Sequence, residues 1–420
     1  MTRNIVALIG LALLAGYSGG GGGDPATSTP APTPSAQPDM LVATSDGLWR
    51  GKATGNGQLI SARPGIEQPG AVFVSEGHVY YHRLQPVQLP AGFELTDIWT
   101  VHTDGTDDHA LVNTIADETA RAAADQWIVY EHDTFPNGTR VSELRSVRGD
   151  TGQQALLATE RFTQYRFLSG QRAVFNTEQR LFSSSLNGTD ARTHAIVNFP
   201  LTLSASGTFD NTLIYREFAS GTGRATLKSI TVSGGSLPVS LDDGLSYVSY
   251  VGHVGSSVVY QRCVIEIDPD DPPRAGACDV DSVNTDGSGR EVLASHSANE
   301  SVQGFIGDQV IIRRNLSGDD QLIAVPVTGG IEQLLMTMTD NEFVQLIVDD
   351  LLIVRRPSGT WTLGMNGTLT KIGSVAGDFG VMAVDDSICL NKGTAVWCMP
   401  LDGSGPQVKI AERGKVVGVL

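Results

Sequence analysis

Basic residues are scarce in this sequence. Its 420 residues include 29 lysine and arginine residues against 46 aspartate and glutamate residues, which gives a formal net charge of −17. Non-specific binding to nucleic acid or to an anionic membrane needs a basic surface, so this composition argues against both functions. Long apolar runs are also missing, because no stretch after residue 40 approaches the roughly 18 apolar residues that span a bilayer.

Sequence signatures of common catalytic sites are missing after residue 39. No nucleophile elbow, H-E-x-x-H motif, P-loop or dinucleotide fingerprint follows an expected strand there. The chain also has no spare segment for an α/β-hydrolase domain, which argues against an enzyme of the prolyl-oligopeptidase type. The eight histidines are scattered, and His78 and His82 are too far apart along one strand to share a metal ion. His253 is the best single candidate for catalysis near a central axis.

A hairpin signature recurs nine times after Met40. Each copy has a short apolar stretch, a glycine-containing turn of the kind that tight hairpins favour, and a second apolar stretch. The spacing is close to the roughly 40–45 residues of one β-propeller blade. The turns are Asn56-Gly57, Asp104-Gly105, Gly149 to Gly152, Asn187-Gly188, Gly234-Gly235, Asp286-Gly287, Gly329-Gly330, Asn366-Gly367 and Asp402-Gly403.

The repeat predicts an all-β fold, a single closed propeller of four-stranded blades over residues 39–420. Nine hairpins indicate nine blades, and eight is the main alternative if the copy at Gly149 to Gly152 is not a true repeat. The first repeat starts at its second strand, and the chain ends in a lone apolar segment, residues 414–420. We therefore expect this last segment to supply the missing first strand and close the ring. The expected second strands are 40–44, 78–82, 127–131, 172–176, 212–216, 257–261, 309–313, 351–355 and 387–391.

The repeats resemble the WD40-like repeats of TolB-type periplasmic propellers. Residues 98–106 (IWTVHTDGT) and 279–288 (DVDSVNTDGS) show the pattern best, an apolar strand followed by Asp-Gly-Ser/Thr. The resemblance implies a propeller and suggests binding to other envelope proteins. TolB-type proteins also have a separate N-terminal α/β domain, for which this chain leaves no room.

The N-terminus resembles a bacterial lipoprotein signal. Residues 1–18 contain Arg3, a short apolar segment and then Leu14-Ala15-Gly16, but Tyr17 stands where the lipidated cysteine would be. A phenol cannot accept the lipid, so the segment is either a cleaved signal peptide or a weak anchor, and a plain secretory signal is the alternative. Residues 19–38, rich in Gly, Pro, Ser and Thr, form an expected disordered linker. We expect an exported bacterial protein, periplasmic, secreted or on the cell surface.

Four cysteines in an exported chain predict two disulfides. Cys263 and Cys278 flank an acidic loop, and Cys389 and Cys398 flank an expected turn at Lys392-Gly393, so each pair falls on neighbouring strands of one hairpin. Zinc is the less favoured alternative, because the spacings are wrong and no histidine is near.

One acidic loop is a weak calcium candidate. Glu266, Asp268, Asp270 and Asp271 lie between Cys263 and Cys278. Four carboxylates on one loop supply oxygen ligands, but the spacing does not match an EF-hand. A solvated charged loop is the simpler interpretation, and no other cofactor is expected.

Basic residues recur at one offset, directly after the expected second strand of each repeat. Equivalent positions form a ring on one face of a propeller, so these residues are candidates for binding an anionic ligand such as an acidic peptide or a charged glycan. The alternative is that they cap strand ends and pair with acidic neighbours. The residues are Arg83, His132, Arg262, Arg314, Arg356 and Lys392.

The sequence thus predicts a monomeric cell-envelope propeller that binds a protein, peptide or glycan. The alternative is a propeller enzyme of the lyase or cyclotransferase type with its site in the central funnel. Such an enzyme should cluster titratable groups with shifted pKa values near the axis.

Overall fold

The structure is a computed structural model of the chain. It describes residues 40–44, 47–51, 57–62, 72–88, 94–159, 164–177, 179–198, 201–219, 222, 224–234, 236–244, 246–266, 274–295, 299–316, 319–374, 379–384 and 386–419. The predicted signal peptide and linker, residues 1–38, lie outside these ranges. No helix within them is long and apolar enough to cross a membrane.

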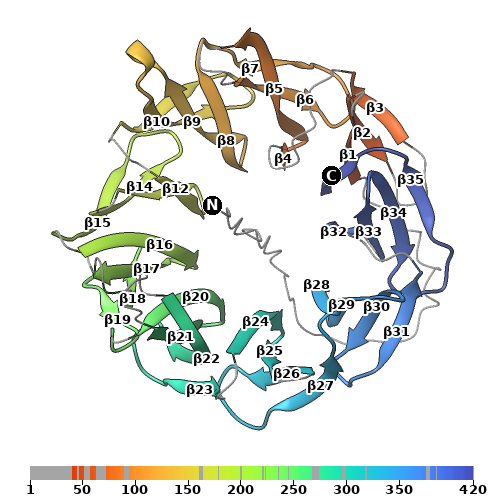
Figure 1. Ribbon diagram of the computed structural model, residues 1–420. Coiled ribbons are helices and arrows are strands. Elements are labelled where there is room, and N and C mark those ends of the chain that lie inside the picture. The colour runs from red at the N-terminus through yellow and green to blue at the C-terminus, as the bar shows by residue number, and fades with distance from the viewer. Residues whose placement is uncertain are drawn as a thin grey trace, which may run out of the picture. The chain divides into compact units, whose positions relative to one another are not determined.

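The described residues form nine four-stranded antiparallel sheets arranged as a propeller (Figure 1). The prediction of nine blades is therefore confirmed, and the eight-bladed alternative is wrong. In each blade the strands run in order from the innermost, here called the first strand, to the outermost, the fourth. One 3-10 helix, η1 (Pro136–Gly138), follows β9.

The blades have the following strands. Blade 1 contains β36 (Lys415–Val419), β1 (Met40–Thr44), β2 (Gly47–Gly51) and β3 (Gly57–Ser61). Blade 2 contains β4 (Val72–Ser75), β5 (His78–Gln88), β6 (Glu94–His102) and β7 (His109–Val112). Blade 3 contains β8 (Asp117–Ala124), β9 (Trp127–Thr134), β10 (Val141–Arg148) and β11 (Gln154–Ala158). Blade 4 contains β12 (Gln164–Ser169), β13 (Arg172–Asn176), β14 (Arg180–Ser185) and β15 (Ala191–Ile196). Blade 5 contains β16 (Leu201–Phe209), β17 (Thr212–Ala219), β18 (Ala225–Thr231) and β19 (Val239–Ser240).

The remaining blades follow the same order. Blade 6 contains β20 (Tyr247–Val254), β21 (Ser257–Glu266), β22 (Arg274–Asn284) and β23 (Glu291–Ala294). Blade 7 contains β24 (Asn299–Ile306), β25 (Gln309–Asn315), β26 (Asp320–Pro326) and β27 (Gln333–Met338). Blade 8 contains β28 (Phe343–Val348), β29 (Leu351–Arg356), β30 (Gly359–Gly364) and β31 (Leu369–Gly373). Blade 9 contains β32 (Phe379–Val384), β33 (Ser387–Lys392), β34 (Ala395–Pro400) and β35 (Val408–Ala411).

The core lies between neighbouring blades. The second strands are β-branched or aromatic runs that are buried on both faces, as their composition predicts. Between blades 2 and 3, for example, Tyr80 and Ile98 pack against Ile128 and Tyr130 in one buried apolar cluster. Each blade therefore buries its faces against both neighbours, and the closed ring leaves no blade with an uncovered face.

The hairpin at Gly149 is a true repeat. It joins β10 to β11 of blade 3, and Gly149 lies against the blade 2 side chain of Tyr80. A Cβ atom at Gly149 would be 2.2 Å from the Tyr80 hydroxyl oxygen, so only glycine allows this contact between blades. The weakest of the nine sequence copies thus has a specific packing role.

The C-terminal strand closes the ring, as predicted. β36 is the innermost strand of blade 1 and pairs antiparallel with β1, which begins the described chain. The register places Met40 opposite Val419 and Ala43 opposite Lys415, with a bulge between Leu41 and Val42. Both ends of the ring are therefore held in one sheet.

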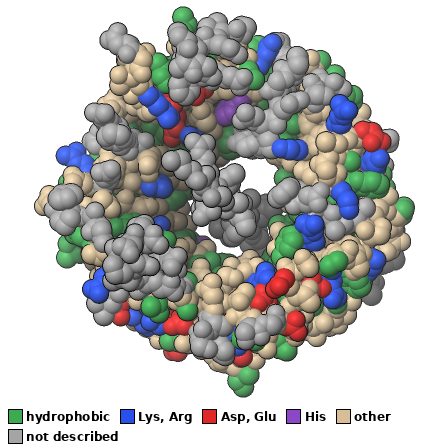
Figure 2. All heavy atoms as spheres, viewed as in Figure 1, with side chains coloured by type: hydrophobic (Ala, Val, Ile, Leu, Met, Phe, Trp, Pro, Cys, Tyr) green, Lys and Arg blue, Asp and Glu red, His purple; other side chains and the backbone are tan. Residues whose placement is uncertain are grey.

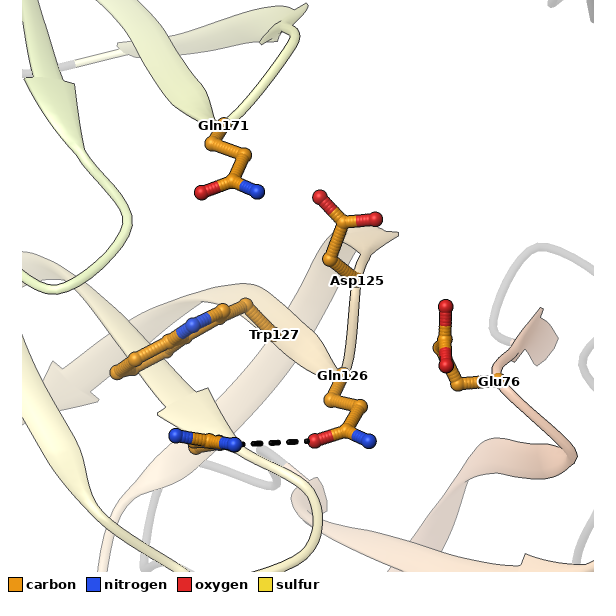
Figure 3. A pocket seen from close by; sticks show the side chains of 6 residues that line it. Glu76, Asp125, Gln126, Trp127 and Gln171 are labelled. Atoms are coloured by element: carbon orange, nitrogen blue, oxygen red, sulfur yellow. Dashed lines mark hydrogen bonds between the residues drawn. The ribbon is translucent and has the colours of Figure 1, made fainter.

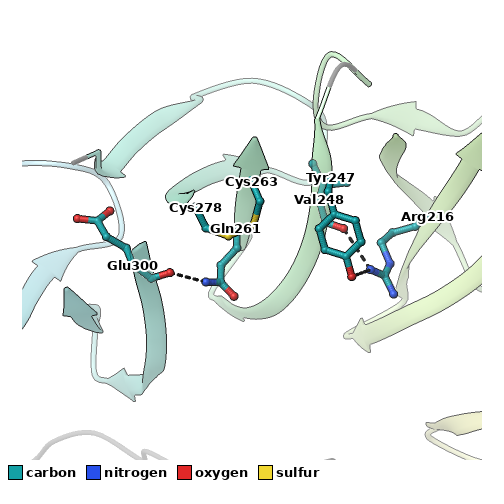
Figure 4. Close-up of a disulfide and its surroundings, with 7 residues drawn as sticks. All are labelled: Arg216, Tyr247, Val248, Gln261, Cys263, Cys278 and Glu300. Atoms are coloured by element: carbon teal, nitrogen blue, oxygen red, sulfur yellow. Dashed lines mark hydrogen bonds between the residues drawn. A yellow bond between two sulfur atoms is a disulfide. The ribbon is translucent and has the colours of Figure 1, made fainter. Parts of the chain in front are cut away.

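Both predicted disulfides are present. Cys263 and Cys278 join β21 to β22 in blade 6, and Cys389 and Cys398 join β33 to β34 in blade 9. Figure 4 shows the blade 6 bridge beside Gln261, whose side-chain amide donates a 2.6 Å hydrogen bond to the Glu300 backbone carbonyl of blade 7. The disulfide thus holds β21 and β22 together, and β21 carries the Gln261 side chain that contacts blade 7.

Loss of the disulfides is expected to destabilise the ring moderately. The bridges close segments with sequence separations of 15 and 9 residues, and loops of this size correspond to about 2–3 kcal/mol each. Urea unfolding with and without reductant measures the difference, and intact mass after alkylation confirms that the thiols are released. Unchanged unfolding of the fully reduced protein would contradict the expected role.

Candidate functional site

The second strands run further than the sequence indicates, so the predicted basic positions lie within them, toward the side of the ring where second and third strands are joined. Four of them have carboxylate partners, and three of these are arginines paired within their own blade. Arg262 contacts Asp281 at 2.8 Å and Asp279 at 3.2 Å, and Arg356 binds Glu342. Figure 2 shows one face of the ring, on which basic and acidic side chains lie next to each other.

Arg314 shows the pairing most fully. Its Nε donates to Glu300 at 2.7 Å, and its two terminal nitrogens donate to Glu332 at 3.0 and 2.8 Å. The guanidinium is buried, and its fork geometry matches two carboxylates. Its positive charge is therefore balanced inside the protein.

The other basic positions differ from one another. The guanidinium of Arg83 lies over the Trp99 ring, 4.7 Å from its centroid, and Lys392 is exposed at the end of β33. The structure thus brings the six residues to one side of the ring, as predicted, but gives most of them an acidic or aromatic neighbour. Their binding of a ligand stays a prediction.

Three of the acidic partners occupy one repeated position, at or just before the start of a first strand. Glu118 pairs in register with His132 in blade 3, Glu300 pairs with Arg314 in blade 7, and Glu342 binds Arg356 in blade 8. The repeats could have revealed this position, because each glutamate follows an Asp or Asn: Asp117-Glu118, Asn299-Glu300 and Asn341-Glu342. Alignment of the second strands alone missed it.

Blade 3 departs from this pattern, because a histidine replaces the arginine. His132 Nδ1 lies 3.3 Å from Glu118 Oε1, and both side chains are buried. Burial lowers the pKa of His132, and burial raises the pKa of Glu118 to about 8, helped by the nearby Asp97 carboxyl of blade 2. At neutral pH, therefore, His132 is uncharged and Glu118 is protonated.

His82 occupies a second repeated position, the fifth residue of a second strand, whose side chain in several blades hydrogen-bonds to the backbone of the next blade. Its Nε2 accepts the backbone N–H of Ala120 in blade 3 at 2.7 Å, so the ring must be neutral. Burial accordingly lowers the pKa of His82 to about 4. Gln261, at the equivalent place in blade 6, makes the contact to blade 7 described above, and Arg216 of blade 5 donates to the Val248 carbonyl of blade 6 at 3.1 Å (Figure 4).

The opposite side of the ring is acidic. Two-residue turns join first to second strands there, and exposed carboxylates recur in them. Within the described residues no ion pair to any of these carboxylates is formed, unlike those on the other side. The turn acids are Glu76, Asp125, Asp210, Asp308, Asp349, Asp350 and Asp386.

Turn chemistry explains part of this acidic set. Glu76, Asp125, Asp210 and Asp349 have positive φ angles of 47–51°, and Asp is tolerated at such positions. Asn and Gly serve the same turns without a charge. The backbone conformation of these turns therefore does not require an acidic residue. The repeated acids add negative charge to this side of the ring.

One cavity of about 320 Å³ lies among these turns, across blades 2, 3 and 4. Figure 3 shows its lining: Glu76, Asp125 and Gln171 come from turns of three successive blades, and the Trp127 ring lies beside them. Arg148 also lines the cavity, but its Nε pairs with Asp150 at 2.8 Å. Glu76 and Asp125 therefore set the sign of the charge here.

A second cavity, of about 530 Å³, lies on blade 8 and differs in character. Its lining is mostly uncharged and comes from β30, β31 and the turn between them, with Asp350 and Leu351 at its edge. It has no aromatic side chain and one carboxylate. We therefore regard the cavity at Trp127 as the stronger candidate site.

His253 and the acidic loop are the remaining predicted site residues. His253 stacks on Phe209 of the neighbouring blade at 4.0 Å, where burial lowers its pKa. Within the described residues no three His, Cys, Asp or Glu side chains are placed to hold a metal ion. Asp268, Asp270 and Asp271 lie outside those residues, as does the side chain of Glu266, so the calcium hypothesis stays a prediction.

No protein-family model matches the sequence, and no curated protein matches it. Solved structures of propellers are similar in fold. Dipeptidyl peptidase 4 from Porphyromonas gingivalis matches with a TM-score of 0.52 and 7% identity, covering 81% of this chain and 60% of that chain. An oligogalacturonate lyase in complex with manganese matches with a TM-score of 0.42 and 13% identity, covering 76% and 96%. The propeller domain of the Trilobed protease from Pyrococcus furiosus matches with a TM-score of 0.42 and 9% identity, covering 82% and 97%. At these identities the similarity shows the propeller fold alone.

Proposed function

We propose that this chain is an exported cell-envelope propeller that binds a basic segment of a protein partner. The acidic side of the ring, with the cavity at Trp127, is the binding surface. Two disulfides fit an oxidising compartment, and the resemblance of the repeats to TolB-type propellers and of the N-terminus to an export signal supports the envelope location.

The observation behind this proposal is the contrast between the two sides of the ring. Most basic groups on one side already have acidic or aromatic neighbours, whereas Glu76 and Asp125 face a cavity whose described basic residue, Arg148, already pairs with Asp150. A lysine or arginine side chain in this cavity would lie between two carboxylates and beside an indole ring, an arrangement that suits cations. The net charge of −17 would speed the approach of a basic partner.

Substitution of the cavity acids is expected to weaken binding of a lysine- and arginine-rich peptide. The variant Glu76→Gln with Asp125→Asn should raise the Kd about tenfold, which corresponds to about 1.4 kcal/mol. Trp127→Ala should also weaken binding, but with little change in its salt dependence. Titration calorimetry at two salt concentrations measures both effects.

The matched control is Asp319→Asn, an exposed acid on the other side of the ring. It removes one negative charge, half the change in the double variant, without touching the cavity, so binding should stay near that of the unmodified protein. If Asp319→Asn weakens binding by half or more of the free-energy change in the double variant, the effect is one of general charge, which contradicts a site at Trp127. Preferential binding of an acidic peptide would favour the basic positions instead.

The propeller-enzyme alternative has a weaker basis. Asp97, Glu118, His82 and His132 do cluster with shifted pKa values. These side chains are half-buried to fully buried, and neither of the two cavities described above is lined by them.

A further inference from the structure

Glu118 lies in the contact between blades 2 and 3 and is 0% exposed. It is the second residue of β8, the innermost strand of blade 3. Its backbone carbonyl accepts a 2.9 Å hydrogen bond from the Thr96 hydroxyl of blade 2, and the Thr114 hydroxyl donates to its carboxyl group. The second carboxyl oxygen, Oε2, is buried without a hydrogen-bond partner in the described structure.

The charged and titratable groups around Glu118 come from every neighbouring strand. Two arginines of blade 3 near Glu118 bind other carboxylates: Arg145 pairs with Glu143 at 2.5 Å, and Arg140 pairs with Asp133. No arginine or lysine therefore balances Glu118 as Arg314 balances Glu300. The groups are His82 and Arg83 on β5, Asp97 on β6, Asp117 on β8, His132 and Asp133 on β9, and Glu143 and Arg145 on β10.

Asp97 and Glu118 also take part in the hydrogen bonds that hold a short bend, residues 114–116, between blades 2 and 3. Gln85 of blade 2 donates to Asp97 at 2.7 Å and also to the backbone carbonyls of Thr114 and Ala116, at 2.8 and 3.0 Å. The bend formed by residues 114–116 is thus held by Asp97 through Gln85 and by Glu118 directly. Ile115, at its tip, is 88% exposed.

We propose that Glu118 and Asp97 form a proton-controlled latch between blades 2 and 3, which holds the 114–116 bend while one proton stays on the pair and loosens when that proton is lost. Loss of the proton places two negative charges in one buried contact, and Arg83, the cross-strand neighbour of Asp97, forms no described ion pair with either acid. The bend and the start of β8 then become more mobile, while the rest of the ring stays folded. An exported protein meets the pH of its surroundings, so such a latch would respond directly to the medium.

The direction of the pH dependence follows from the shifted groups. The pKa of Glu118 is raised to about 8, so its proton stabilises the folded state most at low pH, and this contribution is lost as pH rises toward 8. His82, His132, His194 and His253 have lowered pKa values, and their opposite contribution is complete by about pH 6.5. Between pH 6.5 and 8, therefore, stability is expected to fall.

Thermal unfolding across pH 6.5–8.5 tests the latch. The Tm of the unmodified protein should fall by about 2–4 °C over this range, and Glu118→Gln should remove most of that fall. Glu300→Gln in blade 7 is the matched control, because its partner is Arg314, and it should keep the fall whatever its effect on overall stability. A flat Tm in the unmodified protein, or an unchanged fall in Glu118→Gln, would overturn the proposal.

Two measurements on the unmodified protein avoid dependence on a variant that folds poorly. Infrared difference spectra between pH 6.5 and 8.5 should show loss of a protonated carboxyl band. Protection against hydrogen exchange, measured relative to the intrinsic rate at each pH, should fall at residues 113–124 but not at residues 299–306. If the band persists at pH 8.5, or protection changes equally in both segments, the latch is wrong.

Discussion

A chain that ends after Arg413 should lose most of the stability of the ring, because it lacks β36. The innermost strand of blade 1 would be missing, which exposes β1 and the side chains packed beneath it. Burial of one large aliphatic side chain contributes about 1.5–3 kcal/mol, and Val416 is only part of what is lost. The total stability of a folded domain is about 5–15 kcal/mol. We therefore expect a large drop in Tm, an exposed strand edge and aggregation.

The matched control is a chain that starts at Asp39 and ends at Leu420. It removes more residues than the C-terminal truncation but leaves all 36 strands in place. Differential scanning calorimetry should show a Tm close to that of the full chain for this control. Equal Tm values for the truncation at Arg413 and the control would contradict closure by β36.

Replacement of Arg314 by methionine should be the most damaging of the single substitutions at the basic positions. It leaves Glu300 in a buried place without the guanidinium that now balances it, and breaking such a pair costs about 3–5 kcal/mol. Glu332 adds little to this loss, because its side chain is 48% exposed and water replaces the arginine. Urea unfolding measures the change.

Two further variants separate burial from charge. Arg121→Met removes an arginine that is 41% exposed and bound to Glu131, so its cost should be under about 1 kcal/mol. Glu300→Leu combined with Arg314→Met should recover much of the lost stability, because an apolar pair does not need a counter-charge. A cost for Arg314→Met no larger than for Arg121→Met would contradict the buried pairing. If a variant of Arg314 loses ligand binding, its folding must therefore be measured before the loss is assigned to a missing ligand contact.

Local signals in the sequence predicted the architecture well. Glycine turns and apolar second strands are short-range features, so nine blades, the closing strand and both disulfides were predicted from the residues that form them. The hairpin at Gly149 was the weakest copy because its key contact, with Tyr80, joins two different blades.

Partners of the functional residues were harder to predict, because they lie on other strands and other blades. Alignment of the second strands found Arg314 and His132 but not Glu300 and Glu118, which begin first strands. The link between Glu118 and Asp97 crosses from blade 3 to blade 2. Such a contact depends on how the blades pack, which a pattern within one repeat does not contain.

Sequence patterns drew attention to the basic residues and not to the acids in the turns between first and second strands. The basic offset was visible because basic residues are fewer than acidic ones in this chain, whereas acids in tight turns look ordinary. Only the structure shows that acids of blades 2 and 3 meet at one cavity, beside Trp127. The charge balance of a surface depends on partners as well as on composition.

The most direct test of the proposed function is an array of basic, acidic and neutral peptides together with oligosaccharides, probed with the chain from Asp39 onward. The proposal predicts salt-sensitive binding to the basic peptides, which the Glu76→Gln and Asp125→Asn double variant weakens about tenfold and Asp319→Asn leaves unchanged. Binding to acidic peptides or oligosaccharides alone, or binding to basic peptides that the double variant retains in full, would contradict it.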